Sequence, residues 1–325
     1  MTWSLAIDIG GTFTDVVLRG DDGRLAVDKV LTTHDDLLEG FFGGVDQVLA
    51  KAGVSPAEVT GLVVHATTIV TNALIERKGA PTALITTRGF ADVLSIRNEH
   101  RYEMYYPQIE FAPPLIPRDL TFELDERTLA DGEIERGVDA DEVRALARRL
   151  TDAGVVSVAV CLLNAYRNPE NERVVGGLLK EHAPGLHVSL SSRVAPQIRE
   201  YPRASTTAVN AYAMPISQPY LTGLARGLEA AQVPNRPLIM LSSGGIIGAE
   251  TAAHHPVRMI ESGPAAGALA AAWYAERLGL DRLISFDMGG TTAKACLIEG
   301  RKPLVTGALE VDRAYRFKEG SGMPL

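Results

Sequence analysis

The sequence has 325 residues, of which 46% are hydrophobic and 22% are charged. A chain of this length and composition buries a substantial core and divides into two or more domains, which excludes an intrinsically disordered protein. The formal net charge is -8, the pI is near 5.5, and no long run of Lys or Arg occurs. These values argue against a nucleic-acid surface or a membrane anchor, so we expect small molecules or proteins as partners.

Cys161 and Cys296 are the two cysteines, and each lies in an apolar run where a buried, reduced thiol is the usual occupant. They suggest neither a zinc site nor a disulfide framework. The N-terminus begins on a strand-like run without a basic and apolar leader, and no run of about 18 apolar residues occurs. These features predict a cytoplasmic protein that does not span a membrane.

The first third of the chain alternates short β-rich runs with glycine turns and helical periodicity. The pattern predicts strands at 3–9, 13–18 and 25–27, a helix at 35–52, a strand at 62–64, a helix at 69–78 and a strand at 82–85. Strands that alternate with helices indicate a mainly parallel sheet.

An aromatic and proline-rich stretch follows at about 97–118, and it predicts an irregular surface excursion. The α/β pattern then resumes, with a helix expected at 141–153, a strand at 155–162, a helix at 169–182 and a strand at 187–190. We place a domain boundary around 191–202. The predicted domains are therefore 1–190 and 191–325.

The second region is also α/β in pattern. It predicts helix over 204–231, broken or kinked by Pro215 and Pro219. A strand at 238–241 enters the glycine turn 242–245, and a helix at 261–278 precedes a strand at 283–286 and its return strand at 294–299.

Two loops share the frame Asp, apolar, Gly, Gly, Thr, namely Asp8-Ile9-Gly10-Gly11-Thr12 and Asp287-Met288-Gly289-Gly290-Thr291. Glycine is expected there because a polyphosphate must reach backbone N–H groups, and a Cβ would collide or forbid the backbone conformation. The alternative is a pair of ordinary tight hairpins. Neither loop fits the P-loop or the dinucleotide fingerprint.

We therefore expect a nucleotide whose phosphates are held by two loops. Asp8 and Asp287 are the candidate catalytic residues, and both are candidates for holding Mg²⁺ partly through water. The expected phosphate-binding residues are Gly10, Gly11, Thr12, Thr14, Gly289, Gly290, Thr291, Thr292 and Lys294.

A polar cluster at a strand-to-helix junction contains His65, Thr67, Thr68 and Asn72. It either caps the helix and satisfies backbone groups, or orients substrate or the attacking water. Charged groups also gather at 97–103 and at 200–203, where a solvated loop or a subunit contact is expected. No cluster has metal-ligand spacing, and no nucleophile motif of the G-x-S-x-G type occurs.

The paired loops resemble the phosphate motifs of the actin, hexokinase and Hsp70 superfamily of ATPases, and 258–268 looks like its first connecting helix. A closer resemblance, over the whole chain, is to the hydantoinase A/oxoprolinase family. It is carried by the strings at 7–15, 65–73, 89–93, 242–246, 262–267 and 286–291. The resemblance implies an α/β, ribonuclease H-like ATPase architecture, incomplete in this chain. In that family ATP phosphorylates the carbonyl oxygen of a cyclic amide.

Two features depart from that family. Lys294 stands where many members have a carboxylate, and it either clamps phosphate or points to solvent. The chain is also about half as long as the family's A-type proteins, so we expect a truncated chain whose adenine pocket lies beyond residue 325. On this interpretation the isolated chain binds ATP weakly or not at all.

The resulting hypothesis is an ATP- and Mg²⁺-dependent cyclic amidase that acts on a hydantoin, an N-methylhydantoin or 5-oxoproline. The resemblance implies a hydantoinase B-type partner subunit or fused domain. Two alternatives remain open, a ketone carboxylase subunit of the acetone carboxylase type and an ATP-gated switch without small-molecule chemistry.

Overall fold

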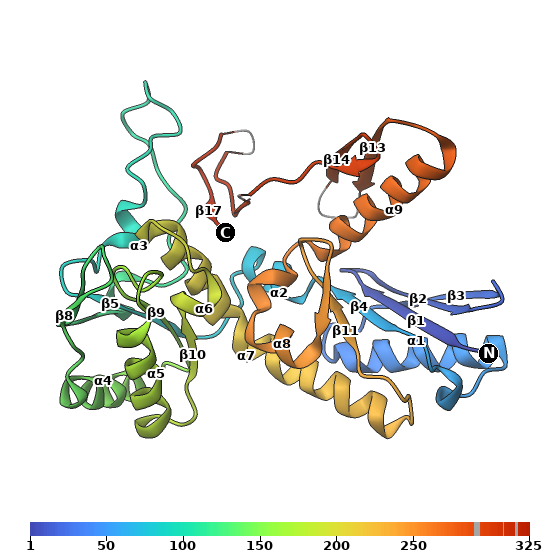
Figure 1. Cartoon of the computed structure of the whole chain (residues 1–325), viewed down its shortest axis with the longest axis horizontal. Helices are drawn as coiled ribbons and strands as arrows, with labels where there is room; N and C mark the ends of the chain where they lie inside the picture. Colours follow the sequence, from blue (N-terminus) through green and yellow to red (C-terminus); the bar gives the residue numbers. More distant parts are fainter. Residues whose placement is uncertain (289–292, 308, 316–317) are drawn as a thin grey trace. The chain divides into compact units, whose positions relative to one another are not determined.

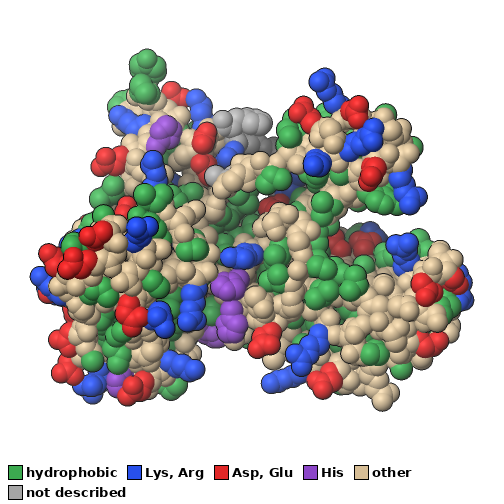
Figure 2. All heavy atoms as spheres, viewed as in Figure 1, with side chains coloured by type: hydrophobic (Ala, Val, Ile, Leu, Met, Phe, Trp, Pro, Cys, Tyr) green, Lys and Arg blue, Asp and Glu red, His purple; other side chains and the backbone are tan. Residues whose placement is uncertain are grey.

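The computed structural model describes residues 1–288, 293–307, 309–315 and 318–325. Contacts divide the chain into two compact units (Figure 1). Unit 1 consists of Met1–Asn72 and Ser217–Thr306, and unit 2 of Ala73–Ile216 and Gly307–Leu325. Each unit therefore combines two separate segments, whereas the boundary expected near residue 191 divides the sequence once. Acidic and basic side chains are interspersed on the face in Figure 2.

Unit 1 contains a mixed six-stranded sheet in the order β12-β11-β4-β1-β2-β3. β1, β2 and β3 form an antiparallel meander, while β4 and β11 run parallel to β1. Apolar residues at alternate positions of β1 face the core, which explains why this strand was predictable. The strands are β1 Trp3–Ile9, β2 Phe13–Gly20, β3 Leu25–Leu31, β4 Val63–Thr67, β11 Leu238–Met240 and β12 Ile246–Gly248.

Helix α1, Leu37–Ala52, covers part of this sheet. Its first turn is capped by Asp36, whose side chain accepts from the Leu38 N–H at 2.9 Å. It ends at Gly53, which has a left-handed backbone with φ of 64°. The helix predicted at 35–52 is therefore confirmed.

A second part of unit 1 is the helix α9, Ser262–Leu278, with the three-stranded sheet β13-β14-β15. The strands are β13 Arg282–Met288, β14 Ala293–Glu299 and β15 Lys302–Pro303. Ala272 and Ala275 of the helix pack against Ile298. The other face of β13 leaves Ile284 and Phe286 more than half exposed, at 63% and 64%.

Unit 2 is built on a parallel four-stranded sheet in the order β10-β9-β5-β6. Helices α4 and α5 pack on one face, and the first half of helix α7, Glu200–Ala230, packs on the other. The two faces explain the continuous burial of β5 and β9. The elements are β5 Thr82–Thr87, β6 Thr121–Leu124, β9 Ser157–Cys161, β10 His187–Leu190, α4 Ala140–Asp152 and α5 Glu170–His182.

Helix α7, Glu200–Ala230, is continuous through Pro215 and Pro219, so the expected break does not occur. Proline lacks an N–H, which leaves the carbonyl four residues earlier without its helical donor. For Pro215 that carbonyl belongs to Ala211, and the Ser157 hydroxyl donates to it at 2.7 Å. A side chain of the neighbouring sheet thus replaces the missing hydrogen bond.

The remaining elements are short. The excursion predicted at about 97–118 contains neither α-helix nor strand, and its last residue, Arg118, begins a 3-10 turn. No helix in the described part of the chain is long and apolar enough to cross a membrane. The short elements are α2 Ile69–Ile75, α3 Val93–Ile96, α6 Ser191–Val194, α8 Ala249–His254, β7 Arg127–Thr128, β8 Ile134–Arg136, β16 Glu310–Val311, β17 Met323–Pro324 and the 3-10 turns Pro56–Glu58, Arg118–Leu120 and Pro256–Met259.

Candidate functional site

The first loop, Gly10–Thr12, lies at one edge of the unit 1 sheet. β1 and β4 run parallel with Ile9 paired to Thr67, and β11 runs parallel to β4. Because neighbouring parallel strands end at the same edge, the loop lies beside the end of β4 and the turn that follows β11. Open α/β sheets bind ligands at this edge.

Two backbone N–H groups of the loop are open. The Gly10 N–H donates to the Phe13 carbonyl at 3.0 Å, but the N–H groups of Gly11 and Thr12 donate to no other described residue. Neither Gly10 nor Gly11 has a positive φ, so the backbone conformation does not by itself require glycine. A Cβ on Gly10 would lie 3.3 Å from the Phe13 carbonyl oxygen, which is a tight contact. A Cβ on Gly11 would meet no atom within 4 Å, which leaves this space to an approaching group.

Thr14, another of the predicted phosphate-binding residues, lies on β2. It is buried, and its hydroxyl lies 3.3 Å from the Thr32 hydroxyl. Thr32 in turn donates to the Gly10 carbonyl at 2.9 Å. The Thr14 side chain therefore supports the loop backbone in this structure.

Asp8 is the carboxylate nearest to the loop in sequence, and it pairs across β1–β2 with Asp15. Partial burial, together with the negative charges of Asp15 and Asp287, raises the pKa of Asp8 from 3.8 to about 6. Its side chain still reaches solvent. Asp15 is balanced by Lys29, whose Nζ lies 2.9 Å from its Oδ1. A bound cation would relieve the repulsion on Asp8.

The second hairpin repeats the register of the first. Asp287 pairs with Lys294 across β13–β14, as Asp8 pairs with Asp15 across β1–β2. Lys294 forms an ion pair with Glu261. The predicted phosphate-binding residues Gly289, Gly290, Thr291 and Thr292 lie outside the described residues.

The first turn of α9 lies next to Asp8. A Cβ on Gly263 would be 3.9 Å from the Asp8 Oδ1. Ser262 is buried, and its hydroxyl has no partner among the described residues. The Glu261 N–H donates to the Thr71 hydroxyl at 3.4 Å. Because a helix N-terminus carries open N–H groups and partial positive charge, this turn suits an anion.

The polar cluster at the end of β4 is divided between buried and partly exposed side chains. His65 is fully buried, with Nδ1 3.2 Å from the Ile7 carbonyl and Nε2 2.8 Å from the Tyr220 hydroxyl. Burial lowers the pKa of His65 from 6.5 to about 4, so it is neutral at pH 7. These contacts favour the structural role among the two that we considered.

Thr67, Thr68 and Asn72 lie closer to the first loop. The Thr67 hydroxyl accepts from the Ile69 N–H at 3.3 Å, which caps α2. Thr68 donates to the Ile9 carbonyl at 3.3 Å and accepts from Asn72 at 3.1 Å. The cluster thus ties the start of α2 to the strand that carries the loop.

No three His, Cys, Asp or Glu side chains among the described residues are close enough to form a metal site by themselves. Mg²⁺ commonly uses one or two carboxylates together with phosphate oxygens and water. Asp8 and Asp287 fit that pattern, because the negative charge of Asp287 raises the pKa of Asp8 and a cation between them would offset that repulsion.

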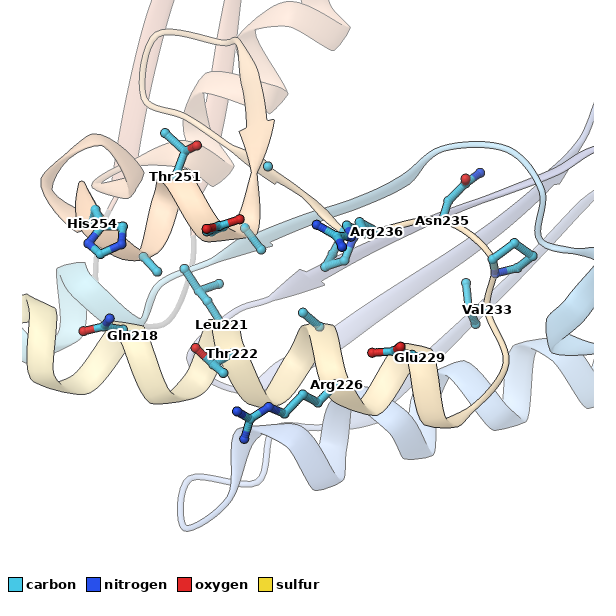
Figure 3. Close-up of a pocket in the computed structure, with 17 residues that line it drawn as sticks. Gln218, Leu221, Thr222, Arg226, Glu229, Val233, Asn235, Arg236, Thr251 and His254 are labelled. Carbon is cyan, nitrogen blue, oxygen red and sulfur yellow. The ribbon is translucent and has the colours of Figure 1, made fainter.

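Another cavity in unit 1, of about 510 Å³, lies between α7 and α8 and takes no lining residue from the first loop. In Figure 3, Leu221 and Thr222 of α7 lie on one side, Thr251 and His254 of α8 on the other, and Arg236 comes from the loop between α7 and β11. The lining combines acidic and basic side chains with polar and apolar ones, and it is not dominated by cations as a phosphate site would be. It therefore does not compete with the strand edge as the phosphate site.

Two sequence profiles of known families match the chain. One, described as the hydantoinase/oxoprolinase N-terminal region, matches residues 4–183, and the other, described as hydantoinase/oxoprolinase, matches residues 203–319. The chain belongs to the hydantoinase/oxoprolinase family. The resemblance inferred from the motif strings is thereby confirmed.

Two curated members of the hydantoinase/oxoprolinase family illustrate its chemistry. The chain is 33% identical to the caprolactamase subunit alpha of Pseudomonas jessenii, over 92% of this chain and 44% of that protein. It is 32% identical to the 5-oxoprolinase of Saccharomyces cerevisiae, over 89% of this chain and 25% of that protein. The chain spans less than half the length of these relatives.

Solved structures confirm the fold class. An acetone carboxylase in nucleotide-free form, described as ATP-dependent, matches with a TM-score of 0.84 and 28% identity, over 92% of this chain and 44% of that chain. The ATP-dependent caprolactamase of Pseudomonas jessenii matches with a TM-score of 0.78 and 32% identity, over 90% and 43%. The predicted α/β architecture of the actin, hexokinase and Hsp70 type is correct.

Three residues of the site were not identified as functional from the sequence. Asp15 and Glu261 each contribute charge, and Thr32 supports the loop from a different strand. The repeated frame contained a usable signal for Asp15, because it holds the same place in its hairpin as Lys294. Nothing local marks Glu261 or Thr32, because their partners are distant in sequence.

Proposed function

We propose that the protein that contains this chain hydrolyses a cyclic amide with ATP, by phosphorylation of the ring carbonyl oxygen. The observation that carries the proposal is the pair of open N–H groups on Gly11 and Thr12, beside Asp8 and the first turn of α9. Caprolactamase and 5-oxoprolinase, which are similar to this chain, support a cyclic amide as substrate.

The chain's own residues would bind and orient the reacting phosphate. The Gly11 and Thr12 N–H groups and the N-terminus of α9 donate to phosphate oxygens, which stabilises the negative charge of the transferring group. Asp8 and Asp287 would hold Mg²⁺, partly through water, and the ion would neutralise phosphate charge. With a pKa of about 6, Asp8 is mostly ionised at pH 7 and available to a cation.

In the proposed reaction the carbonyl oxygen attacks the γ-phosphorus, and the bond to the β-phosphate oxygen breaks to release ADP. Water then adds to the activated carbon. The ring C–N bond breaks, the nitrogen takes up a proton, and hydrolysis of the acyl phosphate releases phosphate. In-line geometry and charge stabilisation are the main sources of rate in such phosphoryl transfers.

The test uses the complete protein with its partner subunit, for which a hydantoinase B-type chain is our proposal. Phosphate release is measured with hydantoin, N-methylhydantoin, 5-oxoproline and caprolactam. Asp8→Asn and Asp287→Asn should each lower ATP-dependent turnover by about 100-fold or more. Asp46→Asn, on the exposed face of α1, is the matched control and should keep full activity.

Ketones with bicarbonate are included because the chain is similar to acetone carboxylase. Phosphate release with a ketone and bicarbonate, and with none of the cyclic amides, would replace the proposed hydrolase with a carboxylase. ATP hydrolysis that needs only a protein partner would indicate a switch. Full turnover in Asp8→Asn would remove that residue from the site.

A further inference from the structure

Glu261, which immediately precedes α9, has a strained backbone. Its φ of 62° and ψ of 25° lie in the left-handed region, which is unfavourable for residues other than glycine. It occupies the N-cap position, where Ser, Thr, Asp, Asn and Gly are preferred, and its side chain caps no N–H of the helix. Neither the backbone nor the helix therefore explains a glutamate here. Strain of this kind concentrates at functional sites, where the side chain compensates for it.

The Glu261 carboxylate is used by Lys294. The two side chains form an ion pair, and neither side chain makes another hydrogen bond or ion pair with a residue that the structure describes. Glu261 is 25% exposed and Lys294 is 32% exposed, so water screens the pair only in part. The pair joins the start of α9 to the second hairpin, and both belong to unit 1.

The equivalent group of the first hairpin is neutralised differently. Asp15 holds in β2 the place that Lys294 holds in β14, because each is paired with the leading aspartate of its own hairpin. Lys29 of the neighbouring strand β3 balances Asp15, with 2.9 Å between the Lys29 Nζ and the Asp15 Oδ1. Lys294 instead takes its counter-charge from the residue before α9. The helix and the second hairpin are thereby tied through charge.

The same helix turn lies at the proposed phosphate site. A Cβ on Gly263 would be 3.9 Å from the Asp8 Oδ1. Ser262, the first residue of α9, is 2% exposed, and its hydroxyl has no partner within the described part of the chain. The open N–H groups of a 17-residue helix and an unpaired buried hydroxyl suit an anion. Glu261 therefore places a negative charge beside the position of the proposed phosphate.

An uncompensated Glu261 carboxylate would repel a phosphate at this turn. Like charges at close range disfavour each other, and the effect grows where water is partly excluded. Lys294 removes this repulsion while it is paired with Glu261. Its ammonium group has three N–H donors on a flexible stem, so it can exchange the carboxylate for a phosphate oxygen. The affinity of the turn for phosphate thus depends on which anion Lys294 contacts.

We propose that Glu261 sets the affinity of the site for a polyphosphate by competing with it for Lys294. When the phosphate binds, the Lys294 ammonium moves from the carboxylate to a phosphate oxygen, and Glu261 is left as a negative charge beside it. Glu261 is a positioning residue, because it acts through Lys294 and does not contact the phosphate. The competition weakens binding and favours the release of ADP and phosphate. The inference rests on the proposed phosphate site, but not on the identity of the cyclic amide.

The test measures binding of tripolyphosphate and of a non-hydrolysable ATP analogue to the complete protein, with Mg²⁺ and by calorimetry. Glu261→Gln removes the negative charge and keeps Lys294, so both ligands should bind about fivefold more tightly. Lys294→Met leaves the carboxylate unpaired, and binding should weaken by about tenfold or more. The variant with both changes should bind more tightly than Lys294→Met alone, because the repelling charge is also removed.

Glu261→Gly separates the effect of charge from that of backbone strain. Glycine suits the φ of 62°, so this variant removes the carboxylate and relieves strain, and its affinity should match that of Glu261→Gln. Asp281→Asn is the matched control. Asp281 pairs with Arg301 at 3.2 Å next to the same sheet, but it follows the C-terminal end of α9, so binding should be unchanged.

Unchanged or weaker binding in either Glu261→Gln or Glu261→Gly would overturn the proposal, and so would a double variant that binds no better than Lys294→Met. An ion pair with a purely structural role predicts that pattern, because its loss would loosen the turn. These outcomes are separate from the proposed reaction, which fails if the parent releases no phosphate with any cyclic amide. A parent that binds neither tripolyphosphate nor the analogue would overturn both.

Discussion

Lys294 forms an ion pair with Glu261, the residue that immediately precedes α9. Lys294 also lies directly across β13–β14 from Asp287. The lysine that replaces the usual carboxylate of the family is therefore neutralised inside unit 1, and does not point freely to solvent. It links the second hairpin to the helix turn that lies next to Asp8.

The Lys294–Glu261 pair should contribute measurably to stability. Both side chains are more than two-thirds buried, at 32% and 25% exposure. A double-mutant cycle of Lys294→Ala and Glu261→Ala in urea unfolding should give a coupling of about 0.5–1 kcal/mol that weakens with salt. The control pair is Arg301–Asp281, which is largely exposed. A coupling no larger than that of the control would contradict the prediction.

Asp8 should destabilise the fold at neutral pH. Its pKa is about 6 in the folded chain and 3.8 as a model value, so ionisation disfavours the folded state. The contribution of the protonated Asp8 side chain to the free energy of unfolding is therefore fully present below about pH 4 and is lost as the pH rises through 6. Asp8→Asn should therefore unfold at a higher temperature than the parent above pH 6, with equal stability near pH 4.

Asp28→Asn is the control for this measurement, because Asp28 lies on β3, at the edge of the same sheet. Thermal unfolding at several pH values provides the comparison. A constant difference between Asp8→Asn and the parent from pH 4 to pH 8 would show that burial and the neighbouring carboxylates do not perturb Asp8.

His65 should make the fold sensitive to acid. Its pKa is lowered by burial from 6.5 to about 4, so the unfolded chain takes up a proton that the folded chain excludes. The contribution of the neutral His65 imidazole to the free energy of unfolding is fully present above about pH 6.5. It is lost as the pH falls towards 4, and the total loss is roughly 3 kcal/mol. His65→Gln should flatten this dependence in urea unfolding between pH 4 and 7. His187→Gln, on a half-buried position of β10, is the control.

The same variants test the alternative role of the polar cluster. A buried imidazole with both nitrogens occupied should not contact substrate, so turnover per folded molecule should persist in His65→Gln. A loss of turnover with intact stability would instead place His65 in the reaction. The comparison is the turnover of Thr68→Ala and Asn72→Ala, whose side chains lie closer to the first loop.

The hairpins and most helices were predictable because their signals are local. The alternation of β1 and the glycine turn at Gly10 specify the first hairpin within about twenty residues. The supports of the loop were not predictable, because Thr14 contacts Thr32 across a strand pair. Likewise the burial of His65 depends on Tyr220, which is 155 residues away in sequence.

The same limit explains the two charged stretches and the helix through the prolines. Arg97 and Arg199 each look like solvated surface, and only the packing of α7 on the parallel sheet brings them to one cavity. Helix-breaking by Pro215 is a sound local expectation, but the hydroxyl that compensates for it lies on a strand 54 residues earlier than Ala211. Sequence rules that consider only neighbouring residues do not identify a hydrogen-bond donor that tertiary packing supplies.

Ser157 and Pro215 should therefore be coupled energetically. Ser157→Ala removes the donor to the Ala211 carbonyl and leaves that carbonyl unsatisfied in a buried position, at a cost of about 1–3 kcal/mol. Pro215→Ala restores an N–H that can donate to the same carbonyl within the helix. In the double variant the serine is thus no longer needed, and its removal should cost about 1 kcal/mol less than in the parent.

Pro219→Ala provides the control, because Pro219 frees the carbonyl of residue 215 and not that of Ala211. The Ser157→Ala cost should be the same in the parent and in Pro219→Ala. Urea unfolding of the three single variants and two double variants supplies both cycles. Equal costs of Ser157→Ala in the parent and in Pro215→Ala would show that the hydroxyl does not compensate for the proline, and the continuity of α7 would then require another cause.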